Sequence, residues 1–401
     1  MLNHSVNSPS SRRWFNPLLL ALVLIGLNMR PLLTSIGPLL PTLRQATGLS
    51  FGGAALLTTL PVLMMGLMAL AGGAINRLFS ERSAVALSLL AIGSGALWRE
   101  LAPGSVQLLM SAVLGGLGIG VIQAVMPGII KHHFLNSMAL VAGLWSAALM
   151  GGGGLGAAIT PWLMSAGHDW HSALAWWALP ALVALLAWWP VSRGLSRLGA
   201  AGENRGPSLL RNRRAWLLGA YFGLINGGYT SLIAWLPPYY MQLGWQPQAS
   251  GSLLALMTFG QVVGALLLPA LARNHDRRPL LLLALMMQLI GFIGLIYLPQ
   301  TLPWLWVWVL VSGLGLGGAF PLCLVLALDH LHQPAAAGRL VAFMQGVGFL
   351  LAGVTPYLSG LLRDYSGGFV LDWQIHALLV VVLIAITWRF HPHSYRRAFA
   401  E

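Results

Sequence analysis

The sequence predicts an all-α integral membrane protein in which twelve transmembrane helices form two six-helix, pseudo-symmetric bundles. Three observations support this fold class. Hydrophobic residues make up 57% of the 401 positions and charged residues only 8%, twelve apolar segments can cross a bilayer, and motifs of the first half recur in the second. Because a soluble domain needs far more charge on its surface, lipid must solvate much of this chain.

Six apolar segments lie in the first half of the chain and six in the second. The first six cover residues 16–41, 51–75, 83–99, 105–130, 138–164 and 172–190. The second six cover residues 215–241, 250–272, 280–298, 303–328, 339–362 and 373–390. Each is close to the ~20 residues that a helix needs to span the hydrocarbon core. The first segment has no small-residue cleavage site near its end, so we expect a retained helix and not a signal peptide.

Basic residues determine the predicted orientation. Twelve spans place both termini on one side, and the tails and loops of that side hold 18 of the 22 Lys and Arg residues. The opposite loops hold Arg44, Arg99 and Arg363, and Arg30 lies inside the first span. The positive-inside rule therefore predicts cytoplasmic termini. The same rule explains the formal charge of +13 without a nucleic-acid partner.

An internal repeat relates the two halves. GGLGIG at 115–120 matches SGLGLG at 312–317, and ITPWL at 159–163 matches VTPYL at 354–358, with offsets of 197 and 195 residues. Parallel repeats of six spans are typical of transporters in which the two halves rock around a central binding site.

The longest predicted loop, 191–214, lies near the midpoint of the chain and is rich in Arg, Gly and Ser. Such a composition is typical of a linker. We therefore predict an N-terminal bundle over 1–190, a cytoplasmic linker over 191–214 and a C-terminal bundle over 215–401.

Arg30 is the main candidate binding residue. Fourteen residues at ~1.5 Å each place it about 21 Å from the cytoplasmic end of its helix, near the bilayer midplane. An unpartnered cation there costs roughly 3 kcal/mol or more. All nine acids are predicted in loops, tails or helix ends, so we expect a bound anion to face the planar guanidinium. The alternative is that Arg30 bonds carbonyls freed by Pro31 and Pro38.

Other polar or aromatic side chains inside the spans are candidate substrate ligands. They are Asn28, Asn226, Tyr229, Trp145, Gln123, Gln261 and Gln345. Two roles stay open for Asn226, which either hydrogen-bonds a substrate or only satisfies the backbone at the Gly227-Gly228 pair, because buried amides in bundles often just link helices. Gly228 is the repeat counterpart of Arg30, and we expect it to leave room opposite the arginine.

Small residues from Ala148 to Gly156 form a stripe that predicts close helix contact. His132 and His133 are neighbours that should diverge on a helix, so no metal site is expected. A single cysteine, Cys323, excludes an intramolecular disulfide and a multi-cysteine metal site. No nucleotide-binding motif or catalytic cluster is present, so we expect neither a cofactor nor an enzyme.

Five stretches carry a family resemblance. They are LIGLNMRPLLTSIGPLLP, GLWSAALMGGGGLGAAITPWL, YFGLINGGYTSLIAWLP, GLGLGGAFPLCLVLALDH and GRLVAFMQGVGF. With them the chain resembles the major facilitator superfamily, and within it the bacterial cyanate permease group. The resemblance implies the major facilitator fold, a place in the bacterial inner membrane, and uptake of a small anion such as cyanate.

The loops after the second span of each half are expected to gate the cytoplasmic side. In the superfamily the first of these usually carries Gly, then Asp-Arg, then Gly-Arg. The corresponding residues here are Gly72, Asn76, Arg77 and Arg82, with Arg273, Asp276, Arg277 and Arg278 in the second half. Asn in place of the usual Asp predicts a weaker charged latch in the first half.

These observations favour a secondary transporter that imports a small anion by alternating access and works as a monomer in the bilayer. A transporter of the same fold for a neutral or nitro-heterocyclic compound, or for another organic anion, is the nearest alternative. A membrane enzyme would need clustered catalytic groups, and a sensor would need a cytoplasmic output domain. Proton symport through a peripheral carboxylate, exchange and facilitated diffusion all remain open.

The charge bias yields a topology prediction. A reporter fused within 191–214 should be active in the cytoplasm, and one within 363–372 should be active in the periplasm, because basic loops stay inside. Paired alkaline phosphatase and fluorescent-protein fusions at both sites measure this. Phosphatase activity at 191–214 would overturn the orientation.

Overall fold

The computed structural model describes residues 16–102, 104–134, 137–194, 209–272, 274–298, 303–331, 333–395 and 397–399. All regular structure in these residues is helical. The first half holds α1 (Pro17–Leu27), α2 (Pro31–Thr34), α3 (Leu40–Thr47), α4 (Phe51–Leu78), α5 (Glu81–Trp98), α6 (Ser105–His133), α7 (Met138–Ser165), α8 (Trp170–Ala175) and α9 (Ala178–Val191). The second half holds α10 (Arg213–Gln242), α11 (Pro247–Leu271), α12 (Arg278–Tyr297), α13 (Trp304–Asp329), α14 (Pro334–Ser366) and α15 (Val370–Thr387).

Twelve spans result from these helices, as predicted. Within the described residues, eleven segments are long and apolar enough to cross a membrane, the first running from α1 through α3 and the sixth through α8 and α9. The remaining span is α10, which is 30 residues long. Its paired arginines at the start and its Asn, Tyr, Gly and Pro residues lower its hydropathy, although most of it is buried among other helices.

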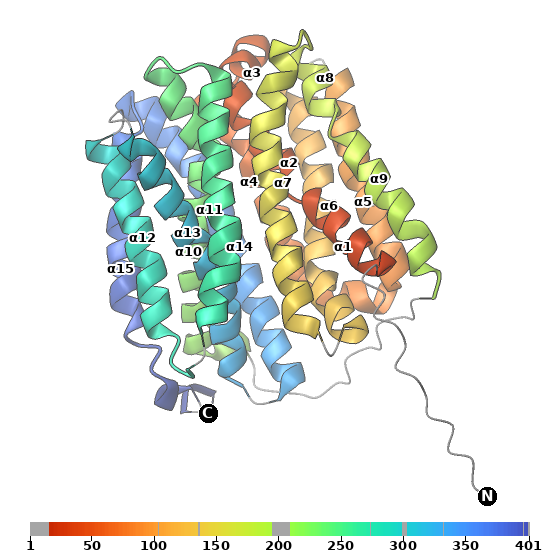
Figure 1. The fold of residues 1–401 in the computed structure, drawn as a ribbon, viewed down its shortest axis with the longest axis vertical. Helices are drawn as coiled ribbons and strands as arrows, with labels where there is room; N and C mark the ends of the chain where they lie inside the picture. Colours follow the sequence, from red (N-terminus) through yellow and green to blue (C-terminus); the bar gives the residue numbers. More distant parts are fainter. Residues whose placement is uncertain are drawn as a thin grey trace, which may run out of the picture.

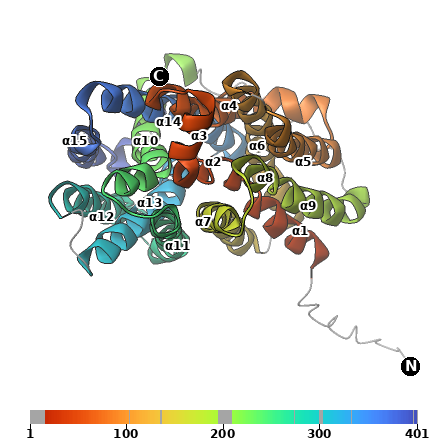
Figure 2. The ribbon, with the colours of Figure 1, turned by 90° about the horizontal axis from the view of Figure 1, so that it is seen from above.

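Viewed from above, α1 to α9 gather on one side of the molecule and α10 to α15 on the other (Figure 2). Contacts between these groups run mainly along α4 against α14 and along α7 against α11. Figure 1 shows these helices running lengthwise through the molecule, with α7 and α11 side by side. Most of the predicted linker lies outside the described residues, so the bundle boundaries stay a prediction.

The first and seventh spans face each other between the two groups of helices. Gly37, between α2 and α3, lies against α10, and a Cβ added there would be 3.1 Å from the carbonyl oxygen of Ile233. Gly66 of α4 approaches the backbone of α14 equally closely, with its Cβ position 2.9 Å from the carbonyl oxygen of Gly346. Small residues thus let the two groups of helices meet backbone to backbone.

Asp364 links the two groups at the outer end, the end that the predicted topology places in the periplasm. Its carboxylate accepts hydrogen bonds from the backbone N–H groups of Phe51 (3.3 Å) and Gly52 (3.1 Å) at the start of α4. A carboxylate at a helix N-terminus is stabilised by the helix dipole and by the free N–H groups. The guanidinium groups of Arg44 and Arg363 lie 3.5 and 4.4 Å from the centre of the Phe51 ring. We call these five residues, Arg44, Phe51, Gly52, Arg363 and Asp364, the outer latch.

Loss of this latch should open the outer side. We expect Asp364→Ala to expose the buried Ser35, because both hydrogen bonds to α4 are lost. The measurement is the labelling rate of Ser35→Cys, in a Cys323→Ser background, by a membrane-impermeant maleimide added outside, and a severalfold increase is expected. Asp169→Ala is the matched control, since Asp169 caps α8 within the first half. Equal labelling with and without Asp364 would contradict the latch.

Candidate functional site

A break in the first span positions the candidate site. Asn28, Met29 and Arg30 separate α1 from α2, and Pro31 begins α2 without a backbone N–H to continue the helix. The small-residue stripe of α7 packs against this break. A Cβ at Gly152 would overlap the carbonyl group of Leu27, and one at Gly156 would lie 2.8 Å from the Cα of Pro31. The predicted close contact of the stripe is therefore confirmed, and the contact supports the break.

Arg30 is buried at this break, with 3% of its surface exposed. Its guanidinium carbon lies 5.2 Å from the centre of the Tyr229 ring on α10. Among the described residues no carboxylate pairs with Arg30, no carbonyl accepts a hydrogen bond from its side chain, and its Nε has no partner. Backbone carbonyls therefore do not neutralise it here, and the guanidinium keeps its donors available to a ligand.

Two more predicted ligands are buried with unsatisfied polar atoms. The hydroxyl of Tyr229 and both amide atoms of Gln261 have no hydrogen-bond partner in the described residues. Gln261 lies one turn along α11 from Thr258. A Cβ added at Gly153 of α7 would be 3.6 Å from the methyl group of Thr258 and 3.3 Å from the Cβ of Arg30. Buried polar groups are nearly always paired in folded proteins, so this centre has the properties of a site that a polar ligand completes.

The two predicted asparagines use their amide nitrogens inside the protein. Asn28 donates to the carbonyls of Leu24 (2.8 Å) and Pro180 (3.1 Å), which ties α1 to α9. Asn226 donates to Phe222, one turn back in α10 (2.8 Å). The bond of Asn226 satisfies a backbone carbonyl of its own helix, which is one of the two roles left open for it. Asn28 uses both of its amide hydrogens and keeps its oxygen for a substrate, whereas Asn226 keeps one amide hydrogen and its oxygen.

Trp145, Gln123 and Gln345 lie around the centre on other helices. The ring of Trp145 on α7 packs against Gly26 of α1, 3.2 Å from its Cβ position. Gln123 on α6 has an unpartnered, buried amide oxygen. Gln345 on α14 is buried and adjoins Gly346, which packs on α4. Arg30 and Tyr229 are in contact. None of the contacts described in the structure joins Trp145, Gln123 or Gln345 to Arg30 or Tyr229.

Gly228 does not provide space opposite Arg30, so that expectation is wrong. A Cβ added to Gly228 would point toward the ring of Phe292 on α12, at 3.4 Å, and toward Nδ1 of His376 on α15, at 3.9 Å. Consecutive residues of a helix point about 100° apart, so Tyr229 faces Arg30 while Gly228 faces away from it. Repeat matching finds equivalent positions, but does not fix the direction in which they point.

Arg99 supports the site and was not predicted to do so. It is fully buried at the end of α5 and donates through both terminal nitrogens to the carbonyl of Leu32 (3.3 Å each) and through Nε to Ser111 (3.3 Å). The Leu32 carbonyl is left without its usual partner because Ile36 N–H bonds to Leu33 instead. The sequence signal was an arginine at the very end of an apolar segment, which looks the same as an arginine in a loop.

The predicted gate residues are held within their own halves. Arg77 donates to the carbonyl of Gly73 (3.2 Å), and Arg82 stacks on Trp189 at 4.3 Å. Gly72 packs loosely on Ala124, and Asn76 has a buried, unpartnered amide oxygen. No described hydrogen bond links these residues to the second half.

The gate residues of the second half pair locally. Arg277 forms an ion pair with Asp329 at 2.7 Å, and Arg278 forms one with Asp276 at 2.7 Å. The hydrogen bonds from Arg278 hold the pKa of Asp276 below its usual range. Arg273 lies outside the described residues.

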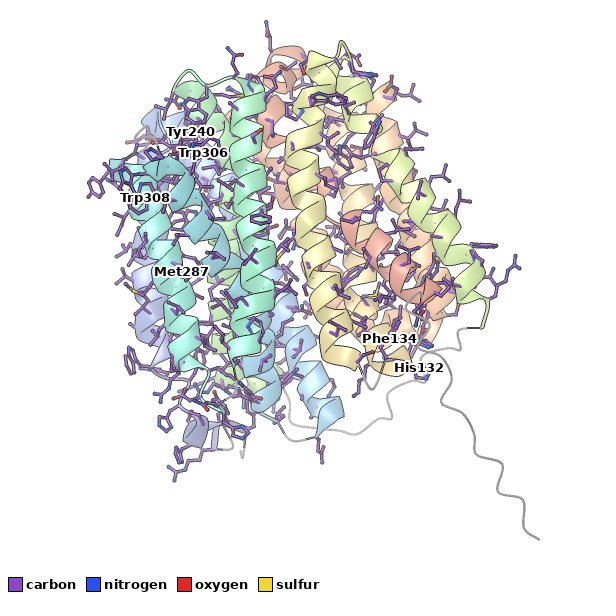
Figure 3. The ribbon with its side chains drawn as sticks, viewed as in Figure 1. His132, Phe134, Tyr240, Met287, Trp306 and Trp308 are labelled. Atoms are coloured by element: carbon purple, nitrogen blue, oxygen red, sulfur yellow. The ribbon has the colours of Figure 1, made fainter. Side chains whose placement is uncertain are left out.

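His132 and His133 converge, so the expectation that they diverge is wrong. Nδ1 of His132 lies 3.2 Å from Nε2 of His133, which lies 2.8 Å from the carboxylate of Glu81 at the start of α5. Both histidines lie in the last turn of α6, and their side chains come together on the side that faces Glu81. Figure 3 shows His132 and Phe134 at the lower end of the molecule, opposite the end where Tyr240, Trp306 and Trp308 lie.

Comparisons with known proteins agree with this architecture. The family model described as "Major Facilitator Superfamily" matches residues 18–356. The chain is 63% identical over 387 residues to the cyanate transport protein CynX of Escherichia coli (strain K12), covering 96% of this chain and 100% of that protein. It is 29% identical to the 2-nitroimidazole transporter of the same strain, covering 91% and 92%. A crystal structure of a D-xylose-proton symporter superposes with a TM-score of 0.75 at 15% identity, covering 93% of this chain and 97% of that one.

Removal of Arg99 should loosen the helix break. Arg99→Ala leaves the Leu32 carbonyl buried without a partner, which typically costs about 1–3 kcal/mol, so we expect a melting temperature lower by several degrees. Arg99→Lys retains a donor for the Leu32 carbonyl, so its melting temperature should lie between those of wild type and Arg99→Ala. Arg193→Ala, at an exposed arginine after α9, is the control. An unchanged melting temperature for Arg99→Ala would refute the supporting role.

Proposed function

Because the chain belongs to the Major Facilitator Superfamily, we propose that this multi-pass membrane transporter imports a small anion, specifically cyanate, by alternating access. Arg30 is the proposed anchor of the anion, with Tyr229 in contact with it and Gln261, whose buried amide also lacks a partner among the described residues, as a further candidate ligand. The high identity to a cyanate transport protein over nearly the whole chain supports the substrate. The lower identity to a nitroimidazole transporter makes a nitro-heterocycle the weaker candidate.

The observation that carries this proposal is the unpaired guanidinium of Arg30. It is buried against an aromatic ring, and its donors find no acceptor among the described residues. Cyanate is a small linear anion with an acceptor atom at each end, so it can take hydrogen bonds from the fixed fork of a guanidinium. A neutral substrate would leave the buried charge of Arg30 uncompensated, which disfavours such a ligand.

Alternating access requires the two halves to separate at one end at a time. The outer latch closes the outer end in the structure, so we propose that substrate enters from outside only after Asp364 releases α4. We also propose a monomer in the bacterial inner membrane with both termini cytoplasmic, with bundles over 1–190 and 215–401 joined by 191–214.

Substitution of Arg30 tests the anchor. Arg30→Ala should abolish uptake of labelled cyanate into proteoliposomes yet leave the melting temperature within a few degrees of wild type, because removing an unpaired buried charge need not destabilise the bundle. Arg30→Lys keeps the charge but loses the planar fork, so it should bind more weakly and retain some transport.

An anchoring role and a structural role of Arg30 predict different results for Arg30→Ala. Normal uptake by Arg30→Ala would exclude it as the anchor, and lost uptake with a collapsed melting temperature would indicate a structural role. A competition experiment distinguishes the two candidate substrates. Excess unlabelled cyanate should block uptake of labelled cyanate, whereas a 2-nitroimidazole should not.

A further inference from the structure

A second buried ionisable group lies on the far side of α10 from Arg30. Asp372 and His376 stand one turn apart on α15, with 3.7 Å between Oδ1 of the acid and Nε2 of the imidazole. Both residues are buried, at 4% and 3% exposure, and the second carboxylate oxygen of Asp372 has no hydrogen-bond partner in the described residues. The sequence placed Asp372 in a loop before the last span. In the structure it is the third residue of α15 and is enclosed by protein.

The depth of this pair follows from the packing of the start of α15. Phe369, just before the helix, is inserted among Phe51, Trp235 and Tyr239, with ring centres 6.1, 5.4 and 6.2 Å away. This aromatic cluster covers the outer end of α15, so Asp372 lies beneath it. The imidazole of His376 stacks on the ring of Phe292 at 5.5 Å.

The surroundings of the pair are almost uncharged. From α14, Ser359 faces the carboxyl group and also lies 3.1 Å from Ser231 of α10. The nearest cation shown on α14 is Arg363, whose guanidinium lies over Phe369 at 5.4 Å. From α10, Tyr239 contacts Trp373 at 5.9 Å. From α12, the contacting residue is Phe292. None of the contacts described gives Asp372 a permanent counter-ion.

We propose that Asp372 and His376 together form the proton-binding site that couples transport to a proton gradient. This inference rests on the proposed transport function. An ionisable pair buried in a membrane protein and not paired with a fixed charge is typical of proton relays. Without a bound proton, the pair carries one negative charge on the carboxylate. One added proton, on the carboxyl oxygen or on the imidazole, makes the pair neutral, and no other bond forms or breaks.

The geometry also links this proton to the anion. Figure 2 shows α10 between α2 and α15, and on α10 Tyr229 contacts Arg30 while the adjacent Gly228 faces His376. A proton on one side of α10 and an anion on the other attract each other through a medium of low dielectric constant. Each ligand therefore strengthens binding of the other by the same factor, typically between 5- and 150-fold for linked sites. Such linkage favours symport of one proton with one anion.

The test separates coupling from substrate transport in proteoliposomes. Wild type should accumulate labelled cyanate when the outside is acidic, and should exchange labelled for unlabelled cyanate when pH is equal on both sides. Asp372→Asn should lose at least tenfold of the gradient-driven accumulation while retaining exchange and melting temperature, because exchange needs no net proton movement. Asp372→Glu should restore part of the accumulation. Glu100→Gln, at an exposed acid, is the control and should behave as wild type.

A substrate-independent readout keeps the inference falsifiable. The infrared difference spectrum of the purified protein between acidic and alkaline pH should contain a protonated-carboxyl band that Asp372→Asn lacks. Full gradient-driven accumulation by Asp372→Asn, or an unchanged infrared band, would refute the proton site. If wild type fails to exchange cyanate, the proposed substrate is wrong, and the infrared band alone then decides the proton site.

Discussion

The break between α1 and α2 is the constraint on which the rest of the site depends. A backbone interrupted inside a membrane must find other partners for its polar groups. Here Asn28 bonds α9, Arg99 bonds the carbonyl of Leu32, and glycines of α7 bring that helix against the break. Once these partners are in place, Arg30 is directed toward α10, and no carboxylate in the described part of the chain pairs with it.

The buried charged groups near the centre differ between the two halves. Among the described residues, the first half buries Arg30 and Arg99 in its interior and Glu81 at the start of α5. Arg99 is satisfied by a carbonyl and a hydroxyl, whereas Arg30 is not. The second half buries a carboxylate beside an imidazole. Since α10 contacts both Arg30 and His376, movement of this one helix changes the surroundings of both ionisable sites. The substrate site requires a permanent cation, whereas the site for the coupling ion requires a pair that gains and loses a proton. The two sites meet these requirements separately because they lie on opposite sides of α10.

The sequence predicted the fold and the central arginine because both depend on local pattern. The twelve apolar segments and the repeat can be recognised in the linear sequence, and so can a charged residue such as arginine inside an apolar segment. Arg99 and Asp372 were assigned to loops because each lies at the end of an apolar segment, where boundaries are uncertain by several residues. Their burial depends on tertiary packing, namely the Leu32 carbonyl for Arg99 and the aromatic cluster around Phe369 for Asp372. The direction of Gly228 likewise depends on helix rotation, which repeat matching does not specify.

The described hydrogen bonds that join the two halves lie at one end of the molecule and not at the other. At the outer end Asp364 bonds backbone N–H groups of the opposite half. At the other end, which the predicted topology places in the cytoplasm, Arg277 and Arg278 pair with acids of their own half, and Arg82 stacks on a tryptophan of its own half. Asn76 replaces the acid that would favour a charged link across this end. Opening the cytoplasmic side therefore breaks none of the ion pairs described there, whereas opening the outer side requires Asp364 to leave a helix N-terminus. The outward-open state should be the less stable one until a ligand binds in the centre.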